Sequence, residues 1–238
     1  KERMVKYLTP IKDKIICAVS GNHERRSGKD ADNDPMYDIM CKLDLEHLYR
    51  PNIAFVKIQL GPKKNSGHKP GKTYVFAVTH GNGGGILSGA TVNRNERFGY
   101  TIDGLDCLIV GHTHKGMVSK PSKIVIDPRN DTVSFKPFTV VSTQSWLSYG
   151  GYAVQKMLLP SSNSSADYGQ KLVLSRKNKL IKVIREDIWE SSEIYMGSHF
   201  FFFRNFYTAS NGGKRIMKSV FKWIKDIVDL IFISIFSS

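Results

Sequence analysis

Three runs of apolar residues in this chain are each followed by a histidine, at the point where a buried strand would end. The three pairs are residues 15–19 before Gly21-Asn22-His23-Glu24, residues 74–78 before Thr79-His80, and residues 105–110 before Gly111-His112-Thr113-His114. Open α/β sheets gather their ligands at the carboxyl ends of their strands, so these side chains are expected at one edge. Imidazole nitrogens bind divalent metals such as zinc and iron. The spacing therefore predicts a metal site.

The donor types narrow the chemistry of that site. Histidine and asparagine next to a carboxylate form a mixed set typical of hydrolytic metal sites, and no cysteine accompanies them. The missing cysteine argues against a closed structural zinc site. Glycines beside the predicted ligands, at positions 21, 81, 83–85 and 111, allow sharp turns and leave backbone N–H groups accessible to a phosphate. Another histidine, His47, lies on the apolar stripe of a predicted helix, and it is expected to be structural or solvated rather than a ligand.

In their order along the chain, Gly-Asn-His-Glu, His80-Gly81 and Gly-His-Thr-His resemble motifs of the calcineurin-like metallophosphoesterase family. The resemblance covers about residues 12–160. It implies two divalent ions per site, drawn from Mn, Zn, Fe or Ni. By the same resemblance, Asn22, His80 and His112 hold one ion and His114 holds its partner. His23 is implied to contact the phosphate and to protonate the leaving group, as the catalytic acid.

Two further motifs of that family are absent from the sequence. Neither Asp-x-His nor the Gly-Asp-x-x-Asp motif occurs, so the carboxylates that would complete and bridge the two ions are missing. We interpret this as truncation at the N-terminus, with the loss of one or more strands. The isolated chain is expected to bind at most one ion weakly and to show little activity.

Hydrophobic periodicity predicts an α/β fold. Apolar residues at helical intervals predict a helix from residue 36 to 50, and strands are expected at 53–60 and 74–78. Short strands are expected at residues 123–126, 132–135, 139–142, 152–159 and 171–186, which indicates a second, more antiparallel sheet. Together with the resemblance, this predicts a two-sheet β-sandwich flanked by helices, in four layers (αββα). The phosphoesterase domain is expected over residues 1–190, and an extension over 191–238.

The charge of the chain bears on its partners. A formal net charge of +14 over 238 residues favours a phosphate-bearing partner, nucleic acid included, although a merely basic surface is the alternative. Residues 91–100 are expected to form a substrate loop in which Arg94 and Arg97 contact the substrate. A solvated loop without that role is the alternative.

The C-terminal residues have a different composition. Apolar residues from Ile216 to Ile231 recur at helical spacing opposite several lysines, which predicts a basic amphipathic helix. Such a helix can lie on a membrane surface or dock on the core or on a partner protein, and docking is favoured. No segment is long enough to span a bilayer. The odd number of cysteines, three, is typical of a reducing compartment, so a cytoplasmic location is expected.

These features lead to one functional hypothesis and two alternatives. The hypothesis is a metal-dependent hydrolase that cleaves phosphate esters, preferably phosphodiesters of nucleic acid or nucleotides, with water activated by two metal ions. One alternative is a protein serine/threonine phosphatase, which would use the same core. The other is a non-catalytic module that binds nucleic acid through its basic surface.

Overall fold

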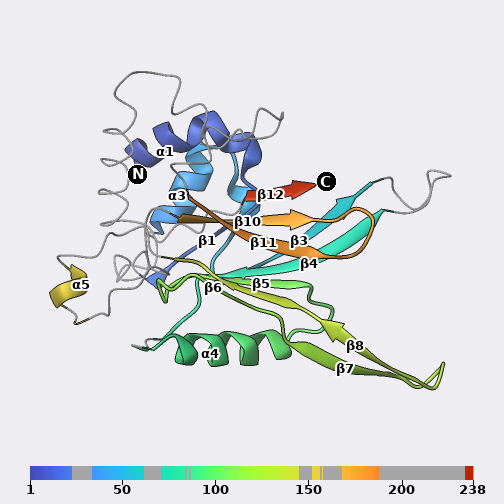
Figure 1. Cartoon of the computed structure of the whole chain (residues 1–238). Coiled ribbons are helices and arrows are strands. Elements are labelled where there is room, and N and C mark those ends of the chain that lie inside the picture. The colour runs from blue at the N-terminus through green and yellow to red at the C-terminus, as the bar shows by residue number, and fades with distance from the viewer. Residues whose placement is uncertain are drawn as a thin grey trace.

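The computed structural model describes residues 1–22, 34–61, 71–83, 85, 87–144, 152–155, 157, 168–187 and 234–237. Over these residues the protein is α/β, with short helices around several sheets of mixed strand direction (Figure 1). None of the helices in these ranges is long and apolar enough to cross a membrane.

A five-stranded sheet forms the centre of the molecule, in the order β3-β4-β5-β9-β6. Its strands are β3 (Ile53–Leu60), β4 (Lys72–Thr79), β5 (Cys107–Val110), β6 (Met117–Ser119) and β9 (Thr139–Ser142). The three inner strands run parallel, and the two edge strands run antiparallel to their neighbours. Every residue of β5 and β9 is buried, as expected for parallel strands that are covered on both faces.

One face of the central sheet packs against a second sheet. This sheet contains β10 (Tyr168–Leu174), β11 (Ile181–Asp187) and β12 (Ser234–Ser237), in the order β11-β10-β12. The shared core is apolar; its members include Tyr74, Phe76, Cys107, Ile109, Val141, Leu172 and Leu174. The Tyr74 hydroxyl donates to the Ser175 carbonyl at 2.6 Å, so a buried polar group is satisfied where the sheets meet. Figure 1 shows this sheet above the central one.

Helix α4 (Ser88–Tyr100) covers the opposite face of the central sheet (Figure 1). The predicted loop at residues 91–100 is therefore wrong, because these residues are helical. The helix buries a stripe of Thr91, Asn95 and Gly99, spaced four residues apart. Small and polar side chains on this stripe carry no apolar periodicity, so the helical pattern was hidden. A Cβ on Gly99 would lie 2.4 Å from the Phe138 ring, which shows how closely the helix approaches the sheet.

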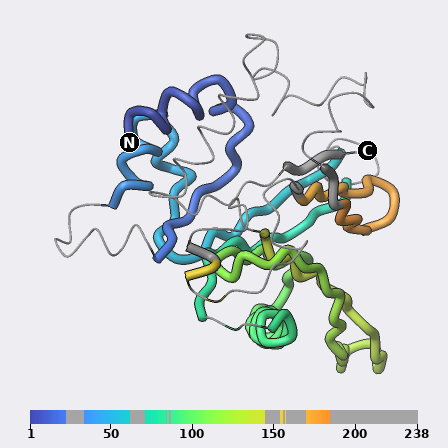
Figure 2. Tube along the Cα trace, turned by 60° about the vertical axis from the view of Figure 1, so that its left-hand side comes forward, coloured from blue at the N-terminus to red at the C-terminus, as the bar shows by residue number. Residues whose placement is uncertain are grey.

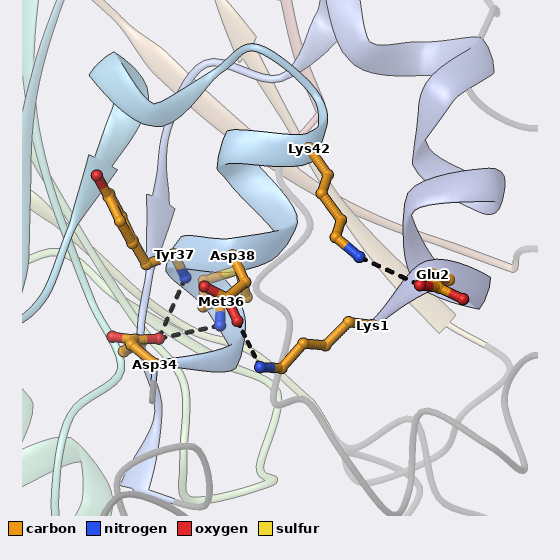
Figure 3. A network of polar contacts seen from close by, with 8 residues as sticks. Lys1, Glu2, Asp34, Met36, Tyr37, Asp38 and Lys42 are labelled. Carbon is orange, nitrogen blue, oxygen red and sulfur yellow. Dashed lines mark hydrogen bonds and ion pairs between the residues drawn. The ribbon is translucent and has the colours of Figure 1, made fainter. Parts of the chain in front are cut away.

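The N-terminal elements build a separate small core beside the sheets. They are α1 (Glu2–Leu8), the 3-10 helix η1 (Thr9–Lys14), β1 (Ala18–Val19), α3 (Pro35–Lys42), the 3-10 helix η2 (Glu46–Leu48) and β2 (Tyr49–Arg50). Met4, Leu8, Met36 and Ile39 are buried together in it. Ion pairs Lys1–Asp38 and Lys42–Glu2 join α1 to α3 at the surface (Figure 3). The two-stranded sheet of β1 and β2 is parallel.

Helix α3 is shorter than its apolar pattern predicted. It ends at Lys42, and Asp44 takes a left-handed backbone with φ 60°, so the predicted continuation to residue 50 is wrong. His47 lies in the 3-10 helix that follows and is exposed. Apolar residues of the 3-10 helix and β2 keep contacting the same small core, which explains the apparent continuation of the helical pattern.

Strands β7 (Ser122–Asp127) and β8 (Thr132–Pro137) form an antiparallel ribbon that leaves the central sheet (Figures 1 and 2). Ile124 pairs with Phe135 and Ile126 with Val133, so all four side chains share one face of the ribbon. They are 64–74% exposed. No other strand among the described residues pairs with this ribbon.

The remaining predictions on the fold have mixed outcomes. Residues 152–155 form the short helix α5 (Tyr152–Gln155) in place of the predicted strand at 152–159, and the rest of that range is not described apart from residue 157. The single strand predicted at 171–186 is two strands, β10 and β11, which pair antiparallel. Of the extension at 191–238, only β12 is described, and the predicted amphipathic helix lies outside the described residues.

Candidate metal centre

The site lies where β4 and β5 end. These neighbouring strands are parallel, with Thr79 opposite Val110, so His80 and the Gly111-His112 turn leave the sheet at the same edge. The Gly111 N–H donates to the Thr79 carbonyl at 3.3 Å, which extends the pairing by one residue. Gly81 has φ +82°, and a Cβ there would lie 2.4 Å from the Val110 side chain, so only glycine fits this turn.

Three of the four predicted metal ligands converge on one point. His80 Nε2 lies 2.9 Å from Asn22 Oδ1 and 2.9 Å from His112 Nδ1. The two imidazole rings are nearly perpendicular, at 78°, with their centroids 4.8 Å apart. His80 is 5% exposed, whereas Asn22 and His112 are half-buried. We call Asn22, His80 and His112 the trio.

The donor atoms of the trio suit a cation. Neutral imidazole carries one N–H, and the other ring nitrogen and the amide oxygen are acceptors. If His80 Nε2 carries the proton, it can donate a well-aligned hydrogen bond to Asn22 Oδ1 or to His112 Nδ1, but not to both. Ligand atoms about 2.1 Å from a six-coordinate ion lie about 3 Å apart, which is close to the separations in the trio. The residues present therefore fit a divalent metal ion.

The turn that carries His112 and His114 has an unusual backbone. His112 and His114 have φ of +67° and +57°, in the left-handed region that non-glycine residues seldom adopt. The N–H of Thr113 between them donates to the Gly111 carbonyl at 2.8 Å, which tightens the turn. Such conformations cost about 1–3 kcal/mol each and cluster at functional sites. His114, the fourth predicted ligand, lies two positions beyond His112 and is not one of the three residues that converge in the described part of the chain.

Carboxylates are missing from the trio. Within the described ranges, no three histidine, cysteine, aspartate or glutamate residues form a metal-binding group. Asp103 and Asp106 precede β5 and therefore lie at the opposite end of this strand from His112. Asp106 is also engaged elsewhere, because it accepts from the Val75 N–H at 2.8 Å and pairs with Lys179 at 2.7 Å.

A polar network holds the base of the Asn22 turn. Ser20 Oγ donates to the Asp34 carboxylate at 2.9 Å, and Tyr49 Oη donates to the same carboxylate. Asp34 also caps α3, since it accepts from the N–H groups of Met36 and Tyr37 at 2.9 and 3.2 Å (Figure 3). Burial by itself would raise the pKa of Asp34, but these hydrogen bonds outweigh it and hold the pKa below its ordinary value.

Sequence reasoning missed this network, although one signal for part of it was present. Asp34-Pro35 before an apolar helical pattern is typical of a helix N-cap, with proline at the first helical position. Ser20 and Tyr49 are 14 and 15 residues away from Asp34 in the sequence, so no local pattern indicates their contacts with it.

The other predicted site residues are placed as follows. Arg94 lies on α4, and its guanidinium donates to the Asn82 carbonyl at 3.0 Å, two residues beyond His80. Arg97 is exposed one turn later on the same helix. His23, the predicted catalytic acid, lies outside the described residues. Arg94 is thus next to the candidate centre, and the substrate roles of Arg94 and Arg97 stay predictions.

Comparison of the chain with protein-family models, with curated proteins and with solved structures finds no match in any of the three. The convergence of the trio at the ends of β4 and β5 is therefore the basis for the proposals that follow.

Proposed function

We propose that this protein is a metal-dependent phosphoesterase of the calcineurin-like type that acts on phosphodiesters of nucleic acid or nucleotides. The observation that carries the proposal is the position of His80 Nε2, 2.9 Å from both Asn22 Oδ1 and His112 Nδ1. Three motifs far apart in sequence supply these atoms, in the order that the resemblance implies. A family-type αββα fold, with two packed sheets flanked by helices, is part of the same proposal.

Each residue has a role in this proposal. Asn22, His80 and His112 hold one ion, and His114 is a ligand of its partner. A pair of divalent ions at such a site supplies an activated water and offsets phosphate charge. His23 would contact the phosphate and give a proton to the leaving oxygen. The left-handed turn at His112 and His114 presents both imidazoles from one short segment.

The basic character of the chain supports a polyanionic substrate over a phosphoprotein. The net charge is +14, and cations near the centre would attract phosphates along a strand. Turnover of bis-nitrophenyl phosphate against mono-nitrophenyl phosphate separates phosphodiesterase from phosphatase activity. A chain that binds nucleic acid in chelator and turns over neither ester with Mn or Zn would be the non-catalytic module.

The trio is tested by metal binding, without any need for turnover. Addition of Mn or Zn to metal-stripped protein should raise the melting temperature, because a ligand that binds only the folded state stabilises it. EDTA should reverse the rise. His80→Ala should abolish it, and so should His112→Gly, a replacement chosen because glycine tolerates φ +67°.

His47→Ala is the matched control, since His47 is exposed on the 3-10 helix after α3. It should leave the metal-induced rise unchanged. If His80→Ala binds metal as the parent chain does, measured by calorimetry on folded protein, the proposed centre is wrong.

A further inference from the structure

The loop that follows His80 lies between two cationic side chains. Arg94 from α4 donates to the Asn82 carbonyl at 3.0 Å, and Lys115 Nζ donates to the Gly85 carbonyl. Lys115 comes directly after His114, so it belongs to the turn that carries His112 and His114. Both turns of the candidate centre are thus bordered by a positive charge.

The backbone of this loop lies tightly against its neighbours. A Cβ on Gly83 would lie 2.4 Å from the Arg94 guanidinium carbon, and a Cβ on Gly85 would lie 2.8 Å from Ala90 Cβ. Gly83 also has φ +88°, which favours glycine. The guanidinium therefore lies directly on the loop backbone, where a side chain would push it away. This contact places Arg94 at a defined position beside the trio.

The spacing along the chain limits how far the Asn82 backbone, which Arg94 contacts, lies from His80. Asn82 is two residues beyond His80, so their Cα atoms are at most about 7 Å apart. The backbone carbonyl that accepts from the Arg94 guanidinium therefore belongs to a segment close to the trio.

Both cations are partly withdrawn from water. Arg94 and Lys115 are half-buried. A charge with less water around it interacts more strongly with an anion that approaches it. The hydrogen bond from Arg94 to the Asn82 carbonyl uses one of the five N–H donors of its guanidinium.

We propose that Arg94 and Lys115 bind the phosphates that flank the scissile bond of a nucleic acid strand. A phosphomonoester has no such neighbours, so this pair selects a polynucleotide over a phosphorylated protein. The inference rests on the proposed function, because the flanking phosphates are defined by the bond that the metal centre would cleave. It extends that function to a site outside the trio, with Lys115 as a contact that the sequence did not indicate.

The test is equilibrium binding of a fluorescein-labelled dT12 oligonucleotide to the 238-residue chain in EDTA, by anisotropy over a range of salt concentrations. For single strands, the log–log salt slope changes by about 0.7 for each phosphate contact. Arg94→Gln and Lys115→Gln should each weaken binding and reduce the slope by about that amount. Arg94→Lys should keep most of the slope, because it retains the charge.

Arg129→Gln is the matched control. Arg129 is exposed in the β7–β8 turn, far from the start of α4 in Figure 1, and the change removes the same charge from the net total. Its slope should equal that of the parent chain. Equal slopes for all variants, or an equal loss in Arg129→Gln, would overturn the proposal.

Circular dichroism and melting curves confirm that each variant is folded before its slope is compared. A variant that does not fold is replaced by Arg94→Met or Lys115→Met, which keep the aliphatic stem. EDTA keeps the outcome separate from the metal centre. Unchanged slopes together with a metal response lost in His80→Ala would refute the phosphate contacts alone. Reduced slopes without any metal response would refute the metal centre, and Arg94 and Lys115 would then be nucleic-acid contacts without a scissile bond beside them.

Discussion

Two pairs of neighbouring strands have similar residues and opposite surroundings. β5 and β9 read Cys-Leu-Ile-Val and Thr-Val-Val-Ser, and every residue in them is buried. β7 and β8 are also rich in isoleucine and valine, yet Ile124, Ile126, Val133 and Phe135 are 64–74% exposed. Both pairs therefore contain the β-branched apolar residues that favour strands, although only β7 and β8 also contain charged residues. The difference is what covers them, since β5 and β9 have sheets or helices on both faces and the ribbon leaves the sheet.

The comparison predicts that one substitution has very different effects in the two pairs. Ile109 in β5 is 1% exposed and Ile126 in β7 is 70% exposed. Ile109→Ala leaves a cavity between two sheets and should lower the free energy of unfolding by about 2–5 kcal/mol. Ile126→Ala should change it by no more than about 0.5 kcal/mol. Urea unfolding measures both, and similar losses would contradict the ribbon's exposure.

The second prediction concerns the polar group at the start of β5. Asp106 is 8% exposed and accepts from the Val75 N–H at 2.8 Å. Asp106→Ala leaves this N–H without its acceptor and should cost about 1–3 kcal/mol in urea unfolding. Asp106→Asn keeps an oxygen at that position and should cost less. If the alanine variant is as stable as the asparagine variant, the hydrogen bond contributes nothing.

The third prediction uses the pH dependence of stability. The pKa of Asp34 is lowered in the folded chain, so the folded state binds its proton more weakly than the unfolded state. Its contribution is then complete above the unfolded value, about 3.9, and is lost as pH falls through the lower folded value. Asp34→Asn, which can still cap α3, should lower the free energy of unfolding by about 1 kcal/mol at pH 7.

The stability difference between parent and Asp34→Asn should shrink as pH falls below about 4, close to the ordinary value of an aspartate. Unfolding curves from pH 3 to 7 give that difference directly. A difference that stays constant over this range would show that the charge of Asp34 is not what stabilises the network.

The smallest effect is expected from shortening the ribbon. Ile124 and Phe135 are directly opposite, so Asn-Gly can replace residues 125–134 as a two-residue hairpin turn. Because the removed residues cover no core, the free energy of unfolding should change by no more than about 0.5 kcal/mol. The metal-induced rise in melting temperature should persist. Its loss would show that the ribbon supports the trio.

The sequence predicted the central strands and the positions of the trio well. β3 has the predicted bounds, 53–60, and the apolar runs before His80 and His112 are strands that end at Thr79 and Val110, one and two residues before those histidines. Buried parallel strands are continuous apolar runs, and glycine marks their ends, so both signals are local. Asn22 lies beside His80 although β1 pairs with β2 and not with the central sheet, so the edge rule for strands of one sheet does not account for its position.

The failures have physical causes. Helix α4 was missed because its buried side contains threonine, asparagine and glycine in place of apolar residues. Asn95 donates to Ser142 Oγ at 2.7 Å, so this contact to β9 is a buried hydrogen bond. Its stabilisation depends on a partner 47 residues away, which periodicity cannot reveal. The exposure of the ribbon was equally unpredictable, because its sequence alternation is that of a covered strand.

Cys107 gives the molecule an internal chemical reporter. Its side chain is 0% exposed at the start of β5, and burial raises the pKa of its thiol far above the ordinary value. A thiol reagent needs the thiolate, so it can react only when β5 separates from its neighbours. Cys17 and Cys41 are half-buried and react from less extensive openings. The slowest labelling step therefore measures how often the central sheet opens. Because β5 ends two residues before His112, a ligand bound at His112 should also change that labelling rate.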